Sequence, residues 1–144
     1  MYKKTAILFL VIIMVIALSG CTAKEKGGPT TADAPPDAVP EIVGKYAVNG
    51  VDPLGTEYGG HLTIQQGEKE HEYLMQWIVV GSIQEGTGVL VGNQLFVEWR
   101  SVEGVARKTQ GEAVYTVTLA GEIYGTRTVD GYSGVGEEIA FPNK

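Results

Sequence analysis

Apolar and polar residues alternate with a period of two over most of the chain after Ile42, in short stretches separated by glycines and polar turns. In residues 58–65, Leu62 and Ile64 fall on one face while His61 and Thr63 fall on the other. Such alternation is typical of a strand with one buried face, whereas an amphipathic helix repeats apolar positions every three or four residues. The pattern therefore predicts an all-β domain.

The pattern predicts about eight strands, with Asn49-Gly50, Gly92-Asn93 and Asp130-Gly131 as turns between some of them. The predicted strands are residues 44–48, 58–65, 72–80, 82–91, 94–100, 112–119, 122–129 and 136–141. Residues 102–110 fit either a strand or a loop. Strands at this spacing favour a single antiparallel barrel or sandwich, and we favour a calycin-like barrel.

The first residues follow a different pattern, that of an export signal. Lys3 and Lys4 precede an unbroken apolar run over residues 6–17, which is too short for a comfortable transmembrane helix. The run closes on Leu18-Ser19-Gly20-Cys21, which resembles the lipobox of bacterial lipoproteins. The resemblance implies cleavage before Cys21 and acylation of that cysteine, for example by palmitate. It also implies that the exported protein is anchored to the cell membrane or the outer membrane, facing the periplasm or the exterior.

The sequence thus divides into three parts: a signal peptide over residues 1–20, a lipidated cysteine with a flexible tether over 21–40, and the β-domain over 41–144. The tether prediction rests on its composition. Gly27, Gly28 and Pro29 are followed by Pro35, Pro36 and Pro40, with few apolar residues to bury. A segment of this kind is expected to stay extended and mobile.

Charge and cysteine content exclude several classes of function. The formal net charge is −6 and no stripe of lysines or arginines is present, so nucleic-acid binding is not expected. Cys21 is the single cysteine of the chain, which excludes a disulfide or a cysteine zinc site within the domain.

No set of residues indicates catalysis or a cofactor. His61 and His71 lack the spacing of a zinc site, so we expect no metal. Glu98, Glu137 and Glu138 include the residue types of a glycosidase pair, but we expect them to be solvated carboxylates. We therefore predict that the protein is not an enzyme and binds no cofactor.

Aromatic residues are the better indication of function, because tyrosine and tryptophan combine an apolar ring with a polar edge. Most are expected in the core, with Trp77 and Trp99 facing inward. A binding surface or cavity is expected to use residues from this set and from the arginines near it. The candidates are Tyr46, Trp77, Trp99, Tyr115, Tyr124, Arg127 and Tyr132. Tyr124 and Tyr132 flank glycines near a turn and are expected to be exposed, with Arg127 and Arg100 serving the same face.

The domain also resembles an uncharacterised family of small secreted β-proteins and lipoproteins of bacteria. The resemblance rests on the spacing of glycine and aromatic residues, as in Tyr73-x-x-x-Trp77, Gly86-Thr87-Gly88 and Asn93-x-Leu95-x-Val97-x-Trp99. Residues 102–110 depart from this spacing as an insertion would. Gly44-x-Tyr46 on the first strand is similar to the start of lipocalin and avidin barrels. Neither resemblance implies an activity.

The leading hypothesis is a membrane-anchored, non-catalytic binding module with a protein or small-molecule ligand. One alternative is an inhibitor of an envelope or host hydrolase, and residues 102–110 are the loop that such an inhibitor would present. Another is a carrier of a small apolar ligand inside the barrel, which requires a cavity of at least about 300 Å³.

The lipobox leads to a direct test. We expect Cys21→Ala to release the protein from membranes or to leave it unprocessed, because the thiol is the site of acylation. Membrane fractionation with acyl labelling measures this. A variant that remains on membranes and still carries the acyl label would contradict the lipobox assignment.

Overall fold

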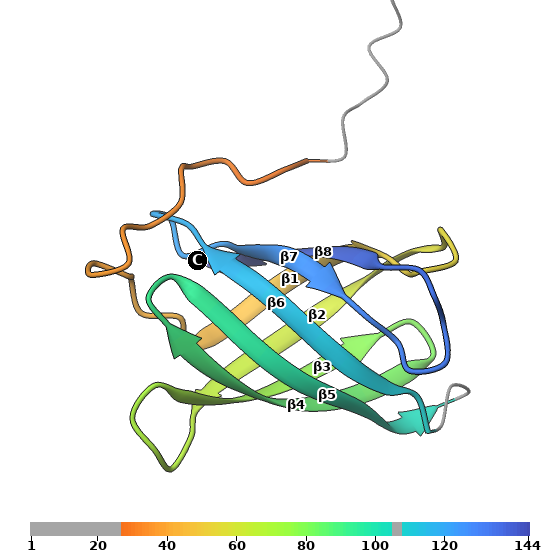
Figure 1. Cartoon of the computed structure of the whole chain (residues 1–144). Helices are drawn as coiled ribbons and strands as arrows, with labels where there is room; N and C mark the ends of the chain where they lie inside the picture. Colours follow the sequence, from red (N-terminus) through yellow and green to blue (C-terminus); the bar gives the residue numbers. More distant parts are fainter. Residues whose placement is uncertain (1–26, 105–107) are drawn as a thin grey trace, which may run out of the picture.

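The chain forms a closed antiparallel β-barrel, in which each strand pairs with the next and β1 pairs with β8 (Figure 1). The structure is a computed structural model that describes residues 27–104 and 108–144. The strands are β1 (Gly44–Val51), β2 (Glu57–Gln66), β3 (Glu72–Val79), β4 (Ser82–Val91), β5 (Gln94–Gly104), β6 (Gln110–Val117), β7 (Ile123–Arg127) and β8 (Gly136–Pro142). The predicted fold class, a single antiparallel barrel of about eight strands, is confirmed.

Residues 102–110, which the sequence left open, belong to two long strands and the connection between them. β5 continues to Gly104, which lies opposite Ser82 of β4, and β6 begins at Gln110 opposite Arg100. A register shift between Ile83 and Gln84 accommodates the extra length of β5. Residues 105–107, in the loop proposed for an inhibitor, lie outside the described residues.

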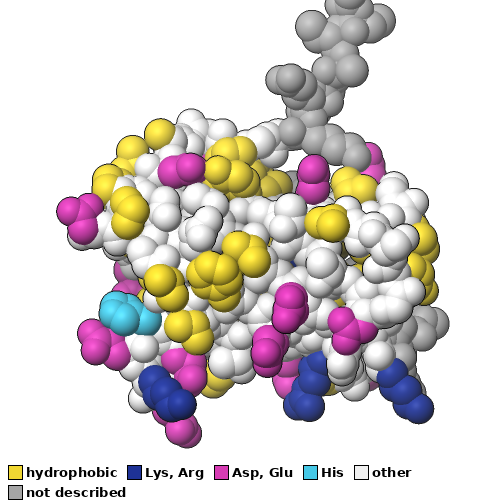
Figure 2. Space-filling view, viewed as in Figure 1, with side chains coloured by type: hydrophobic (Ala, Val, Ile, Leu, Met, Phe, Trp, Pro, Cys, Tyr) yellow, Lys and Arg dark blue, Asp and Glu magenta, His cyan; other side chains and the backbone are white. Residues whose placement is uncertain are grey.

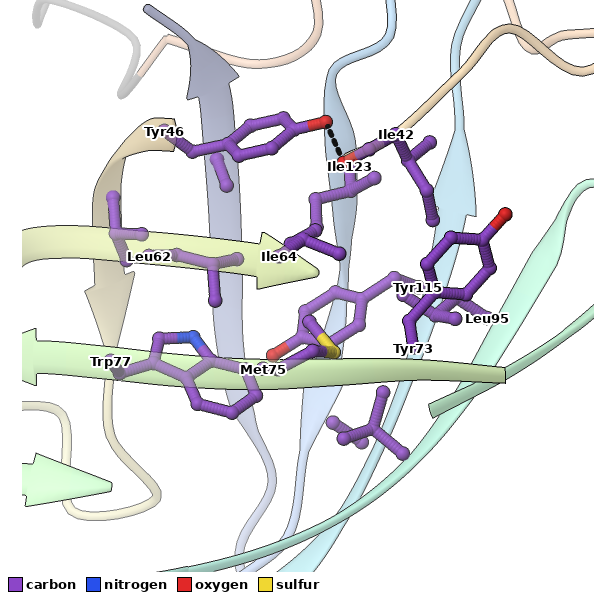
Figure 3. Packing of buried hydrophobic residues seen from close by; sticks show 14 of the residues in the cluster. Ile42, Tyr46, Leu62, Ile64, Tyr73, Met75, Trp77, Leu95, Tyr115 and Ile123 are labelled. Atoms are coloured by element: carbon purple, nitrogen blue, oxygen red, sulfur yellow. Dashed lines mark hydrogen bonds between the residues drawn. The ribbon is translucent and has the colours of Figure 1, made fainter. Parts of the chain in front are cut away.

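Buried inward-facing residues of seven strands, together with Ile42, fill the barrel with a hydrophobic core, and the partly buried Leu90 of β4 packs against it. Trp77 is fully buried and Trp99 is 5% exposed, so the prediction that both face inward is confirmed. Figure 3 shows the packing of this core, with Tyr115, Met75 and Trp77 close together. The interior of the barrel is therefore occupied by side chains.

Two glycines lie opposite Trp99 on its neighbouring strands, Gly86 on β4 and Gly111 on β6. A Cβ atom at Gly111 would lie 2.0 Å from the carbonyl oxygen of Thr128, and one at Gly86 would lie 3.0 Å from the Trp77 ring. Side chains are thus excluded at both positions. Glycines within strands also permit the sharp bends that close a small barrel.

The first described residues form a strap (residues 27–42) that lies against one end of the barrel (Figure 1). The Ala34 N–H donates to the Val117 carbonyl at 2.9 Å, and the Leu119 N–H donates to the Ala32 carbonyl at 2.8 Å. Ala34 is 1% exposed, and Ile42 is fully buried in the core. The predicted boundary at residue 41 and the flexible tether are therefore wrong for this segment. Its backbone groups are bound by the barrel, which composition alone does not reveal.

A buried carboxylate holds the strap. Glu122, in the turn between β6 and β7, accepts hydrogen bonds from the backbone N–H and hydroxyl of Thr30 and from the Thr118 hydroxyl. Burial alone raises the pKa of Glu122, but these hydrogen bonds outweigh it and lower the pKa below the usual value of 4.5. The strap contact therefore favours the ionised carboxylate.

Within the described residues, no helix is long and apolar enough to cross a membrane. The predicted signal peptide and Cys21 lie outside the described residues.

The strap predicts a difference between two truncated chains, one beginning at Gly27 and the other at Glu41. We expect the longer chain to be more stable, because only this chain keeps the hydrogen bonds to Glu122 and Val117. The part of this advantage that comes from the Thr30–Glu122 hydrogen bonds is present above pH 4.5 and is lost as the pH falls through the lowered pKa of Glu122, while the backbone bonds to Val117 do not titrate. Urea unfolding at several pH values measures the difference. Equal stability of the two chains at neutral pH would contradict the role of the strap.

Candidate functional site

A carboxylate lies at the centre of the barrel interior, on the last strand. Glu138 of β8 is 3% exposed, and each of its two oxygens accepts two hydrogen bonds. Oε1 accepts from the Trp77 indole N–H at 2.9 Å and the Tyr115 hydroxyl at 2.7 Å. Oε2 accepts from the Tyr58 hydroxyl at 2.6 Å and from Arg127 at 2.7 Å. Four donors thus compensate for its lost hydration.

The guanidinium of Arg127 forms an ion pair with Glu138 and lies between two tryptophan rings. Its Cζ atom is 5.0 Å from the ring centroid of Trp77 and 4.3 Å from that of Trp99. Nη2 donates to the side-chain oxygen of Gln84 at 2.7 Å. Burial alone lowers the pKa of Arg127, but the charge of Glu138 outweighs it and raises the pKa above its usual value. The charge is held by cation–π contacts as well as by the ion pair.

The two tyrosines of this network are held in their protonated form. Burial, followed by the charge of Glu138, raises the pKa of Tyr58 and of Tyr115 well above 10. Both phenols therefore act as hydrogen-bond donors at neutral pH, as the carboxylate requires.

This buried network (Tyr58, Trp77, Gln84, Trp99, Tyr115, Arg127 and Glu138) contains one residue from each strand from β2 to β8. Each oxygen of Glu138 already accepts two hydrogen bonds from protein donors. The arrangement suits the closure of the barrel rather than acid–base chemistry, which needs a group within reach of a reacting atom.

The sequence-predicted site residues separate into two groups in the structure. Tyr46, Trp77, Trp99, Tyr115 and Arg127 are all at most 5% exposed, so they form no accessible surface. Trp77, Trp99, Tyr115 and Arg127 meet in the buried network. Tyr46 instead donates from its hydroxyl to the Ile42 carbonyl at 2.7 Å (Figure 3).

The expected exposed face of Tyr124, Arg127 and Tyr132 is wrong as a set. Tyr132 is 50% exposed, but Arg127 points into the barrel, where Ile123 on the same strand is also buried. Tyr124 is half-buried on the outer face and donates to Asp33 of the strap at 2.8 Å.

Sequence reasoning also missed the role of Glu138, which was expected to be solvated like Glu98 and Glu137. Glu98 and Glu137 are exposed, as predicted, while Glu138 is buried. The alternation of β8 carried a signal: Gly136, Glu138 and Ala140 share its inward face. Tyr58 and Gln84 were not among the candidates either.

The outer surface of β2 to β6 is hollowed by a groove of about 810 Å³, which we call the outer groove. Two rows of outward-facing side chains line it, and in each row the residues lie opposite one another on successive strands. One row is Gln65, Leu74, Thr87, Glu98 and Glu112; the other is Thr63, Gln76, Glu85, Arg100 and Gln110.

Gly86, Trp99 and Gly111 lie on the strands between these rows and also line the groove. Both glycines occupy inward-facing positions, so a side chain at Gly86 would meet the Trp77 ring inside the barrel rather than stand in the groove. Trp99 is 5% exposed, and its indole Nε1 is buried without a hydrogen-bond partner among the described residues. The hollow shape and the polar walls make this the candidate binding site of the barrel.

The comparisons with known proteins concern the fold. No protein-family profile and no curated protein sequence matches this chain. Among solved structures it is similar to a designed barrel titled "De novo design of a fluorescence-activating beta barrel", with a TM-score of 0.49 and 18% identity. The match covers 71% of this chain and 93% of the designed one.

The buried network predicts a large cost for removing its charge. We expect Glu138→Gln to lower the free energy of unfolding by about 3–5 kcal/mol, because it leaves the Arg127 charge buried without its partner. Its exposed neighbour provides a matched control, since Glu137→Gln is expected to change stability by less than about 0.5 kcal/mol. Chemical denaturation measures both variants. A Glu138→Gln protein as stable as the control would contradict the role of the network.

Proposed function

We propose that this protein is a non-catalytic binding module, exported and anchored to a membrane through acylated Cys21, and that its outer groove receives the ligand. The lipobox of residues 18–21 supports the anchor. The groove is the observation that supports the binding role, because it combines a volume of about 810 Å³ with polar side chains that point outward. The proposed ligand is a protein or a small molecule.

The strap brings this surface close to the membrane. The barrel holds the chain from Thr30 onward, so the chain between Cys21 and Thr30 can span at most roughly 30 Å. The linker between the lipid anchor and the barrel is then short, so the binding module stays near the membrane.

Two alternatives use different surfaces. An inhibitor of an envelope or host hydrolase is supported by the acidic residues of the outer groove, which suit a basic cleft in an enzyme. A carrier of an apolar ligand needs an empty interior. The large buried side chains of Trp77, Tyr115 and Leu62 occupy that space, so the geometry favours an external ligand over an internal one.

The proposal predicts where a ligand acts. We expect backbone amide signals of the groove residues, among them Thr87, Glu98 and Glu112, to shift when a ligand is titrated into the ¹⁵N-labelled chain that begins at Gly27. The titrated panel comprises a cationic peptide, an anionic peptide, a neutral oligosaccharide and a fatty acid. NMR chemical-shift mapping makes the measurement.

Shifts confined to the core around Leu62 and Tyr115 on addition of the fatty acid would favour the carrier instead. Hydrolysis of a panel member would contradict a non-catalytic module.

A further inference from the structure

We infer that the partner bound in the outer groove is an extended segment of a basic protein, with lysine or arginine side chains alternating with apolar ones. This inference rests on the proposed binding role and names the ligand class for the same site. It follows from the charge of the groove, from an apolar strip beside it and from the closed topology of the barrel.

The charge of the groove favours a cationic ligand. Glu85, Glu98, Glu112 and Asp130 line it, against Arg100 as the single cation among its lining residues. The ion pairs within the described residues are His71 with Glu70 and Arg127 with Glu138, so none of them neutralises these four carboxylates. Exposed carboxylates gathered in a hollow attract an opposite charge more strongly than isolated ones do.

An apolar strip runs directly beside the groove row that contains Glu98 and Glu112. Val89, Phe96 and Val114 lie opposite one another on β4, β5 and β6, two residues along each strand from Thr87, Glu98 and Glu112. Their side chains are 46%, 44% and 38% exposed. On the face that shows β4 to β6, hydrophobic side chains gather with acidic side chains next to them (Figure 2). A ligand for both surfaces needs apolar and cationic groups in alternation.

The shape of the surface favours an extended peptide over a small cation. The rows cross five strands, which at a spacing of about 4.8 Å gives a length of roughly 19 Å. That length matches about six residues of extended chain. Every strand of the closed barrel already has two neighbours, so a peptide cannot add itself to an edge. Recognition must therefore use side chains, and the exposed rows provide them.

The test uses the full chain in nanodiscs of zwitterionic phosphatidylcholine, with empty nanodiscs as the blank. The probe is a dye-labelled, capped decapeptide in which lysine and leucine alternate. Two comparison peptides replace either lysine by glutamate or leucine by serine. Fluorescence anisotropy measures binding at about 20 mM and about 200 mM salt, because screening separates charge attraction from apolar contact.

The variants distinguish binding at the groove from attraction to the net negative charge of the protein. The groove variant is Glu85→Gln with Glu98→Gln and Glu112→Gln. Its control, Glu68→Gln with Glu103→Gln and Glu137→Gln, removes the same charge at exposed sites outside the groove lining. Phe96→Ser tests the apolar strip, and Leu54→Ser, in the β1–β2 turn, is its control.

We expect the lysine–leucine peptide to bind, more weakly at the higher salt concentration, and neither comparison peptide to match it. The groove variant and Phe96→Ser should each weaken binding by about tenfold, while both controls stay within about twofold of the unchanged protein. Equal loss in the groove variant and its control would overturn the inference, because it would reduce the attraction to net charge. Equal binding of the peptide in which serine replaces leucine would overturn the inference that the partner carries apolar side chains.

The outcomes distinguish a wrong partner class from a wrong binding role. If an anionic peptide or an oligosaccharide shifts the groove signals in the NMR panel and the lysine–leucine peptide does not bind, the partner class is wrong and the binding module stands. If no member of the panel and no peptide acts at the groove, both are wrong.

Discussion

The barrel depends most on the buried carboxylate of Glu138. An ionised group this deep in a barrel is strongly disfavoured unless its hydration is replaced, and here two phenols, an indole and a guanidinium replace it. Glu138 lies on β8, whose pairing with β1 closes the barrel. The network therefore joins the last strand to the strands before it, from β2 onward, and gives the closed arrangement a specific geometry that apolar contacts alone do not impose.

Because the interior of the barrel is filled, the proposed binding site lies on its outer surface. The hydrogen-bonding groups of Glu138 are saturated by protein atoms, and Trp77 and Tyr115 occupy the space that a ligand of a barrel would use. Gly86 and Gly111 lie opposite Trp99 on the neighbouring strands, at inward-facing positions that do not accommodate side chains. Trp99 stacks on Arg127 inside the barrel, while its chain neighbours Glu98 and Arg100 point outward and line the groove.

The sequence predicts the strands well, because period-two alternation is a local property of each segment. Register is not local, so the rows that place Thr87 beside Glu98 and Glu112 become visible only in the barrel. The burial of Arg127 and Glu138 was missed because charged residues are usually exposed and their partners are far away in sequence. The strap was missed for a related reason. Its composition resembles a linker, and the contacts that hold Thr30 come from Glu122, 92 residues further along.

The hydrogen exchange rate of the Trp77 indole N–H tests the central claim most directly, since this proton is bound to Glu138 in the filled interior. The account predicts that it exchanges only when the whole barrel unfolds, so that its protection equals the free energy of global unfolding. The same rate is expected when an apolar ligand is added. Fast exchange under native conditions, or protection that changes with an apolar ligand, would show an interior that opens and would contradict the account.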